Sequence, residues 1–380
     1  MSNKVAIIHD WLVDCGGAEK VVAALLELYP QADLFSTVCF MTDEQLDELG
    51  YQKPVNTSFI QRLPFAKRLY RTYFPFMPFA VEQFDLSDYE LIISSSSSVA
   101  KGVITSPENI HICYCHSPMR YAWDMQAQYL KESRLEKGLS SIFARFFLAM
   151  ARTWDVRSSF GVDVFVANSA FISQRIKKCY RRDSEVVHPP VDVELFSANQ
   201  DKDDYYVTCC RLVPYKRIDL IVEAFNKMPD KKLVVIGRGP EESRLRAMAN
   251  SNVVFAGRLP ISDLRRHFSC ARAFVYAAEE DFGIVLAEAL ASGTPVIAYK
   301  KGGASEIVQH GKTGIHFESQ TANAIVSAVE LYEKHGISFS PIEIKQSSNR
   351  FSKTEFKLRF HRIVESNTSL ASRPSPEHTT

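Results

Sequence analysis

Two carboxylates bracket a predicted helix start in the second half of the chain. Glu280 lies in an acidic loop, and Glu288 lies two turns along the helix that follows. Gly283 stands near the start of that helix, where backbone N–H groups without intrahelical partners and the helix dipole attract an anion such as phosphate. On this interpretation Glu280 hydrogen-bonds sugar hydroxyls and Glu288 accepts both hydroxyls of a ribose. The alternative is that the acidic loop only favours the helix N-terminus and that Glu288 is a solvated helical position.

Two cations follow the first predicted strand of the same half. Arg211 and Lys216 are separated by a loop after the strand at residues 206–210, so both can reach one point at the carboxyl end of that strand. Open α/β sheets bind ligands at this edge. A planar guanidinium and a compact ammonium can together neutralise a diphosphate, including the charge that grows on it as a leaving group. The alternative is a basic pair at the domain surface.

The first half carries two weaker motifs. Gly16-Gly17 follows the first predicted strand and lets a ligand approach the backbone closely, although a plain tight turn would use the same residues. His116 lies just beyond the strand at residues 110–113, and Pro118 keeps the backbone before it extended. A histidine at the end of such a strand faces a ligand cleft, or else is a satisfied core residue. His188, His267 and His335 have no comparable neighbours and receive no role.

These residues need a scaffold of alternating strands and helices. Short apolar runs alternate with helical patterns in both halves, which is typical of βαβ units with parallel sheets. The predicted strands are 5–8, 34–38, 91–94, 110–113 and 164–167, then 206–210, 233–236, 253–255, 273–276 and 296–298. Two prolines in the Val187–Asp192 segment interrupt the alternation. The sequence therefore predicts an α/β chain of two doubly wound domains, residues 1–190 and 191–345, then a helix over 346–366 that returns to the N-terminal domain, and a disordered tail over 367–380.

Composition limits the other classes. The 380 residues carry 45 Lys and Arg against 44 Asp and Glu, a net charge of +1 that offers no overall field for nucleic acid. The eight cysteines contain no C-x-x-C pair, so neither a zinc cage nor a disulfide framework is expected. The start of the chain lacks the pattern of a signal peptide, and its most apolar long segment, residues 142–151, is too short to cross a bilayer. A cytoplasmic protein is expected, with any membrane contact peripheral.

The motifs together resemble glycosyltransferase family 4, the retaining transferases of the GT-B fold. The E-x7-E pattern from Glu280 to Glu288 follows an R-x4-K pattern from Arg211 to Lys216, and the other matching segments come in the family's order. Those segments are Gly16–Lys20, Val187–Asp192, Gly237–Pro240 and Gly302–Gly303. The resemblance implies two Rossmann-like domains that face each other across a cleft, with a nucleotide sugar held mainly by the C-terminal one and acceptor binding on the N-terminal side. It covers most of residues 5–315.

The resemblance also assigns roles. The family's matching Arg and Lys bind the pyrophosphate, and the matching histidine touches the donor sugar, so the expected catalytic residues are His116, Glu280, Arg211 and Lys216. The donor site is expected to comprise Gly16, Gly17, Arg211, Lys216, Gly237, Arg258, Glu280, Asp281, Phe282, Gly283, Ile284 and Glu288. Arg120 and Tyr121 are expected on the acceptor side. The departing phosphate serves as the base in same-face attack, so no protein nucleophile, metal or cofactor is expected.

Within the family, His9-Asp10-Trp11-Leu12 and the loop from His116 to Tyr121 most resemble bacterial O-antigen and lipopolysaccharide mannosyltransferases that use GDP-mannose. The expected acceptor is a lipid-linked glycan, carried on undecaprenyl diphosphate. A UDP-sugar donor stays open, as do a non-hydrolysing sugar-nucleotide epimerase and a nucleotide-sugar-binding scaffold without turnover. Basic and aromatic residues alternate between Arg62 and Phe76. This segment either rests on the anionic cytoplasmic face of the inner membrane or packs within the N-terminal domain.

Overall fold

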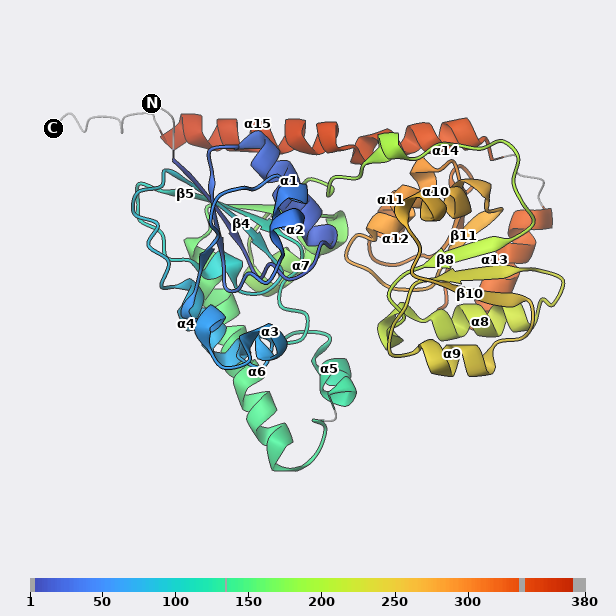
Figure 1. The fold of residues 1–380 in the computed structure, drawn as a ribbon, viewed down its shortest axis with the longest axis horizontal. Coiled ribbons are helices and arrows are strands. Elements are labelled where there is room, and N and C mark those ends of the chain that lie inside the picture. The colour runs from blue at the N-terminus through green and yellow to red at the C-terminus, as the bar shows by residue number, and fades with distance from the viewer. Residues whose placement is uncertain (1–3, 134, 335–338, 372–380) are drawn as a thin grey trace. The chain divides into compact units, whose positions relative to one another are not determined.

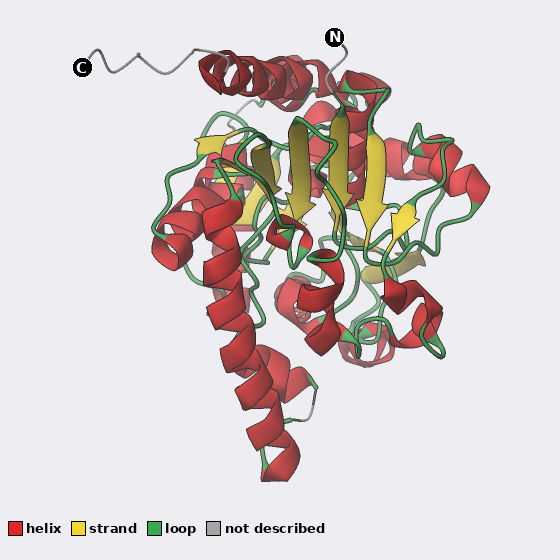
Figure 2. Ribbon diagram, turned by 90° about the vertical axis from the view of Figure 1, so that its left-hand side faces the viewer, coloured by secondary structure: helices red, strands yellow, loops and turns green. Residues whose placement is uncertain are grey.

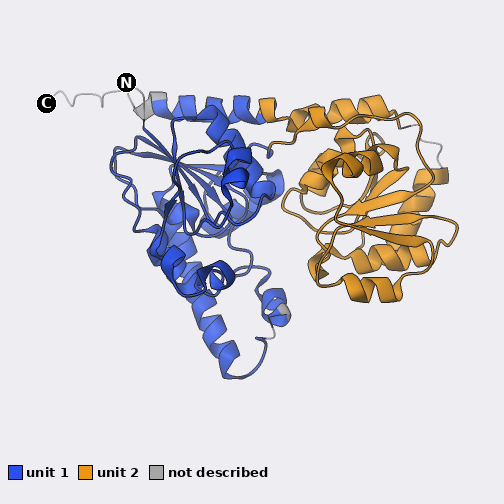
Figure 3. Ribbon diagram, viewed as in Figure 1, with its two compact units in different colours: residues 1–189, 356–380 blue, residues 190–355 orange. Residues whose placement is uncertain are grey.

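The computed structural model describes residues 4–133, 135–334 and 339–371 (Figure 1). The chain divides into two compact units, which Figure 3 colours separately. Unit 1 comprises residues 1–189 and 356–380, and unit 2 comprises residues 190–355. Unit 2 thus begins inside the Val187–Asp192 segment whose prolines interrupt the alternation of strands and helices.

Unit 1 is built on a seven-stranded sheet in the order β3-β2-β1-β4-β5-β6-β7, and every neighbouring pair is parallel. Figure 2 shows the strands of this sheet side by side. The strands are β1 (Val5–His9), β2 (Asp33–Ser36), β3 (Asn56–Thr57), β4 (Leu91–Ser96), β5 (Ile110–Cys115), β6 (Val164–Ala167) and β7 (Glu185–Val186). Strand order reverses between β1 and β4, which places a topological switch point at their carboxyl ends.

Unit 2 has a six-stranded parallel sheet in the order β10-β9-β8-β11-β12-β13. Its strands are β8 (Tyr206–Cys209), β9 (Leu233–Ile236), β10 (Val253–Gly257), β11 (Ala273–Tyr276), β12 (Val296–Tyr299) and β13 (Gly314–Phe317). This is the 3-2-1-4-5-6 order of dinucleotide-binding folds, with the switch point between β8 and β11.

The helices provide the crossovers and cover the sheets. In unit 1 they are α1 (Gly17–Leu28), α2 (Asp43–Glu48), α3 (Ala66–Leu69), α4 (Met77–Val81), α5 (Gln126–Glu132), α6 (Gly138–Ser158) and α7 (Ala170–Tyr180). In unit 2 they are α8 (Ile218–Asn226), α9 (Glu242–Met248), α10 (Ile261–Cys270), α11 (Ile284–Ala291), α12 (Ala304–Ile307), α13 (Ala322–Lys334) and α14 (Pro341–Ser347). Both units bury separate apolar clusters on the two faces of the sheet, as doubly wound domains do.

The fold agrees with the predicted doubly wound domains, and all ten predicted strands are present, with ends that shift by up to two residues. Three strands were not predicted. β3 and β7 have two residues each, too few for a periodic signal. β13 was missed because His316 interrupts its apolar run, which is held in place by pairing with β12.

The C-terminal helix differs from its prediction at both ends. It is α15 (Lys353–Ala371), not residues 346–366, because Phe351 is buried in the core of unit 2 and ends a separate turn before the helix begins. From Phe356 onward the helix belongs to unit 1. It continues past residue 366, where the Ser366 and Thr368 hydroxyls donate to carbonyls of the preceding turn. The predicted disorder of residues 372–380 lies outside the described residues.

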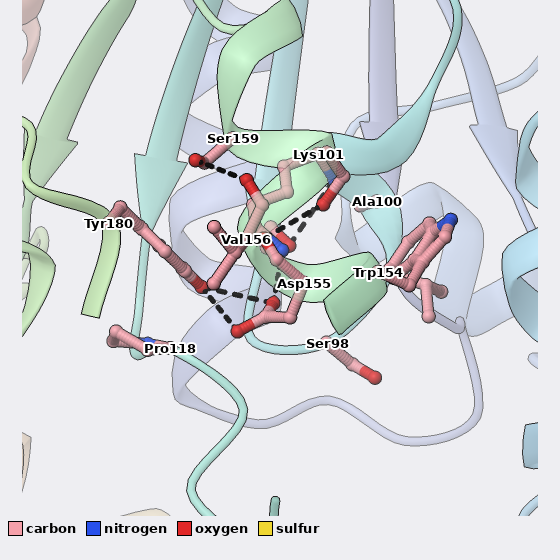
Figure 4. A network of polar contacts seen from close by, with 12 residues as sticks. Ser98, Ala100, Lys101, Pro118, Trp154, Asp155, Val156, Ser159 and Tyr180 are labelled. Atoms are coloured by element: carbon pink, nitrogen blue, oxygen red, sulfur yellow. Dashed lines mark hydrogen bonds and ion pairs between the residues drawn. The ribbon is translucent and has the colours of Figure 1, made fainter. Parts of the chain in front are cut away.

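A buried ion pair joins three segments of unit 1 (Figure 4). Lys101 follows β4 and donates to the carboxylate of Asp155 in α6, and the two side chains are 2% and 0% exposed. Tyr180 in α7 donates to the same carboxylate from 3.0 Å, and Trp123 Nε1 donates from 2.8 Å. The ammonium also lies 5.4 Å from the centroid of the Trp154 ring. Burial of a charge is tolerated here because each member has partners.

Candidate functional site

In unit 2 the switch point brings together a lysine, a glutamate and a tyrosine. Lys216 ends a 3₁₀ turn after β8, Tyr276 ends β11, and Glu280 lies in the loop before α11. The Lys216 ammonium donates to Glu280 Oε1, and it lies 3.2 Å from the hydroxyl of Tyr276. Lys216 and Glu280 are 12% and 17% exposed. Two residues that the sequence placed at one ligand are thus in direct contact.

Electrostatics keep this lysine charged. Burial alone would lower the pKa of Lys216, but the neighbouring Tyr276 and Glu280 outweigh burial and raise the pKa above its ordinary value. Burial and the negative charge of Glu280 also raise the pKa of the Tyr276 hydroxyl, so Tyr276 stays neutral. The cluster therefore presents a fixed cation beside a carboxylate at neutral pH.

The acidic loop is held by a pair of glycines after β12. Gly303 N donates to the carbonyl of Glu280 at 2.8 Å, and Glu280 forms a parallel bridge with Gly302. Gly302 has φ +65, and a Cβ there would lie 2.1 Å from the Glu280 carbonyl oxygen. Because only glycine permits this approach, Gly302 sets the position of the glutamate backbone.

Helix α11 orients the second predicted carboxylate. Its sequence IVLAEALA contains Glu288 as the one charged residue, and most of its apolar positions are fully buried. Glu288 is half-buried and contributes to raising the pKa of Cys209, after burial and Cys210, so it lies near the end of β8. The Glu288 side chain is therefore partly shielded from solvent, and its contact with a ribose stays a prediction. Gly283 precedes the helix with φ +91, and Ile284 is its first residue.

The loops after three adjacent strands each present an exposed arginine. Arg211 follows β8, Arg238 follows β9 and Arg258 follows β10, and among the described residues none of the three guanidinium groups has a hydrogen-bond or ion-pair partner. Backbone hydrogen bonds connect these loops, from Leu212 N to Arg238 O at 3.0 Å and from Gly237 N to Gly257 O at 2.8 Å. Arg211, Arg238 and Arg258, here called the arginine edge, make this edge of the sheet positively charged and thus suited to an anion.

Sequence reasoning missed Arg238. The signal was its position two residues beyond the end of the buried strand β9, which matches the position of Arg211 two residues beyond β8. The remaining predicted residues of this half lie as follows: Asp281 is half-buried, Phe282 is buried, and Gly237 packs so closely that a Cβ would lie 1.9 Å from the Cys210 carbonyl oxygen.

In unit 1 a chain of polar contacts crosses the ends of β1, β4 and β5. His9 Nδ1 lies 3.1 Å from the Ser95 carbonyl oxygen, and Ser95 Oγ lies 2.8 Å from His116 Nε2. His9 Nε2 lies 3.5 Å from Glu19 Oε1, and the other oxygen of Glu19 accepts from Gly16 N at 2.9 Å. These polar contacts therefore link the predicted glycine loop at Gly16 to the predicted histidine, His116.

The pKa values of His9 and His116 shift in opposite directions. Burial alone would lower the pKa of His9, but the hydrogen bond and charge of Glu19 raise it above 6.5. Burial, followed by the charge of His9, lowers the pKa of His116 to about 4. A neutral His116 can accept or donate a hydrogen bond without carrying charge.

Sequence reasoning named His116 and the glycine loop but assigned no role to His9, Glu19 or Ser95. The signal for His9 was its place at the end of a buried strand, and the run of serines at the end of β4 was the signal for Ser95. Asp10 belongs to the scaffold, since its carboxylate accepts from Ser97 N and Oγ and from the backbone N–H groups of residues 99 and 100, at 2.6–2.8 Å.

The predicted acceptor-side residues are packed into unit 1. The Tyr121 hydroxyl lies 2.6 Å from Ser98 Oγ, and its ring contacts Phe74 at 5.2 Å between centroids. Arg120 is half-buried, and Gly17 is the first residue of α1. No group of three or more His, Cys, Asp or Glu side chains in the described part of the chain could hold a metal ion.

Comparison with known proteins connects both halves to one enzyme class. Residues 15–195 match the family model described as "Glycosyltransferase Family 4", and residues 194–353 match "Glycosyl transferases group 1". A GDP-mannose-dependent alpha-(1-6)-phosphatidylinositol monomannoside mannosyltransferase of Mycolicibacterium smegmatis is 31% identical over 213 residues, which cover 48% of this chain and 56% of the relative. The chain thus spans about half the length of the curated relatives it matches.

Solved structures agree in fold. A sucrose-phosphate synthase of Thermosynechococcus elongatus superposes with a TM-score of 0.72 at 17% identity, covering 97% of this chain and 100% of the other. HepE of Anabaena, in complex with UDP and glucose, superposes with a TM-score of 0.68 at 17% identity, covering 96% and 100%. The two Rossmann-like units are those of the GT-B fold, as predicted. The two family models together match residues 15–353, and the chain belongs to glycosyltransferase family 4.

Proposed function

We propose that this protein is a retaining α-mannosyltransferase that moves mannose from GDP-mannose to a lipid-linked glycan. The observation that carries the proposal is the contact of Lys216 with Glu280 and Tyr276 at the switch point of unit 2. The donor assignment is supported by the mycobacterial relative, whose name states GDP-mannose dependence. The name of that relative also supports a lipid acceptor, since it acts on a phosphatidylinositol mannoside.

The chemistry follows from the charges of unit 2. Lys216 and the arginine edge hold the diphosphate and stabilise the negative charge that develops on it when the glycosidic bond to the donor breaks. Glu280 accepts hydrogen bonds from the sugar hydroxyls, and Glu288 accepts those of the ribose. The acceptor hydroxyl attacks from the face that the diphosphate leaves, and the leaving phosphate takes its proton. The proposed reaction requires no protein nucleophile and no metal ion.

The setting is proposed from the sequence resemblance. We place the protein on the cytoplasmic face of the inner membrane, in the assembly of O-antigen or lipopolysaccharide, with undecaprenyl diphosphate as the lipid carrier. A UDP-sugar is the second donor candidate, because HepE, a solved structure of similar fold, holds UDP and glucose. A change of donor base would leave the roles of Lys216 and Glu280 unchanged.

The test is release of nucleoside diphosphate from GDP-mannose and from UDP-sugars, with and without a membrane extract that supplies acceptors. We expect acceptor-dependent release from GDP-mannose, and NMR of the product should show an α-linkage. Preference for a UDP-sugar would overturn the donor assignment, and conversion of the donor to an epimer without acceptor would overturn the transferase assignment.

Two variants test the site. Lys216→Ala and Glu280→Gln should each lower kcat by at least about 10²-fold, since each removes a contact to developing charge or to the sugar. Lys231→Ala is the matched control, because Lys231 is also a partly buried lysine of unit 2 in an ion pair, with Glu333, at 2.5 Å. Near-normal turnover of both site variants would refute the assignment.

A further inference from the structure

Helix α6 of unit 1 exposes an apolar stripe that the fold does not use. Figures 1 and 2 show its N-terminal half projecting beyond the strands of unit 1. Six large apolar side chains of α6 between residues 139 and 150 are between 42% and 75% exposed. They are Leu139, Ile142, Phe143, Phe146, Phe147 and Met150. Soluble monomers rarely expose so large a contiguous apolar surface without a partner for it.

The spacing of these residues places them on one face of the helix. They follow the i, i+3, i+4, i+7, i+8, i+11 pattern of an amphipathic helix. A different face binds the helix to the protein, since Leu148, Ala151 and Trp154 pack against a core cluster of unit 1. The exposed stripe is therefore not required for packing within unit 1.

Charge identifies the partner. The segment from residue 137 to 154 has three basic and no acidic residues, and the segment from residue 49 to 81 has five basic and no acidic residues. Side chains from residues 60–81 share the core cluster that receives α6, so both basic segments belong to the same part of unit 1. The second segment also exposes Phe65, Phe76 and Phe79, whereas Tyr70 is buried. The segment from Arg62 to Phe76 thus packs partly within unit 1, as one sequence-based alternative has it, and contact with a membrane stays a prediction.

We propose that the apolar stripe of α6 inserts into the interfacial layer of an anionic phospholipid bilayer, with the two basic segments contacting the headgroups. A second copy of the chain is disfavoured as the occupant, because symmetric pairing would bring like charges together. The helix lies in the interface plane, since none of the described helices is both long and apolar enough to span a bilayer. The inference deepens the proposed function, because the proposed lipid-linked acceptor is carried in such a membrane.

The test compares two double variants in sedimentation with vesicles of equal parts phosphatidylglycerol and phosphatidylcholine. Phe143→Ser with Phe146→Ser should raise the lipid concentration for half-maximal binding by at least about tenfold, since two inserted aromatic side chains are lost. Ile261→Ser with Ile342→Ser is the control, since it removes two similarly exposed apolar side chains from unit 2. It should bind as the unaltered protein does. Vesicles of phosphatidylcholine alone, or high salt, should weaken binding of all forms.

Equal lipid binding by both double variants, or no binding by the unaltered protein, would overturn the inference. So would a change from dimer to monomer caused by the α6 double variant, because the stripe would then be a contact between copies. A Phe146→Trp variant gives a direct measure of insertion, since acyl chains labelled with bromine should quench the added fluorescence. Turnover of GDP-mannose with a detergent-dispersed acceptor should be unchanged in the α6 variant, which separates failure of this inference from failure of the proposed reaction.

Discussion

Breaking the buried pair of Lys101 and Asp155 should destabilise unit 1 far more than removal of a surface ion pair. In Lys101→Met the carboxylate keeps two neutral donors, Tyr180 and Trp123, but loses its only cation among the described residues. An unpaired buried charge costs about 3–5 kcal/mol, and we expect a loss of this size. Asp155→Asn should cost a similar amount, because it leaves the ammonium buried without a counter-charge.

The double variant Lys101→Met with Asp155→Asn separates charge from packing. It contains no buried charge, and its remaining cost is that of imperfectly satisfied donors, about 1–3 kcal/mol. The two single effects sum to about 6–10 kcal/mol, so the interaction energy of the double-mutant cycle should be at least about 3 kcal/mol.

Urea unfolding followed by tryptophan fluorescence is the assay. All three tryptophans, Trp11, Trp123 and Trp154, lie in unit 1, so the signal reports that unit. Lys177→Met is the matched control, since its partner Asp183 is 91% exposed, and it should leave the midpoint unchanged. The reasoning is refuted if Lys101→Met costs less than about 1 kcal/mol or if the two single effects are additive.

Two further predictions concern backbone and pH. Gly302→Ala should weaken donor binding, measured by calorimetry, at least about tenfold, because the added methyl group displaces the Glu280 loop. Gly311→Ala is the control, since Gly311 has φ +77 but nothing within 4 Å of an added Cβ. This control adds only backbone strain and should leave the affinity unchanged. Burial lowers the pKa of both His111 and His116 to about 4. As the pH falls from 6.5, these histidines therefore bind protons in the unfolded chain before they do so in the folded protein. Unit 1 should accordingly lose stability between pH 6.5 and pH 4. His111→Gln should reduce that loss in urea titrations at several pH values, and an unchanged pH dependence would contradict it.

Local sequence was sufficient for ten of the thirteen strands that the structure describes and for the residues at their ends. These ten strands are largely apolar runs between turn residues, so their positions follow from the order of neighbouring residues along the chain. The same holds for Lys216, Glu280 and His116, which follow strands and therefore lie at ligand-binding edges. Helix boundaries near residue 350 were less predictable, because Phe351 has helical spacing with Phe356 but packs in another unit.

The pairing of side chains across strands was decided by tertiary structure. Lys216 and Glu280 are 64 residues apart, and they meet only because β8 and β11 are neighbours where the strand order reverses. The chain from Glu19 through His9 and Ser95 to His116 likewise requires the order β1-β4-β5. Sequence specifies which residues stand at the strand ends through local periodicity. Only long-range packing of the sheet determines which of those ends are adjacent, and adjacency is what shifts their pKa values and assembles the site.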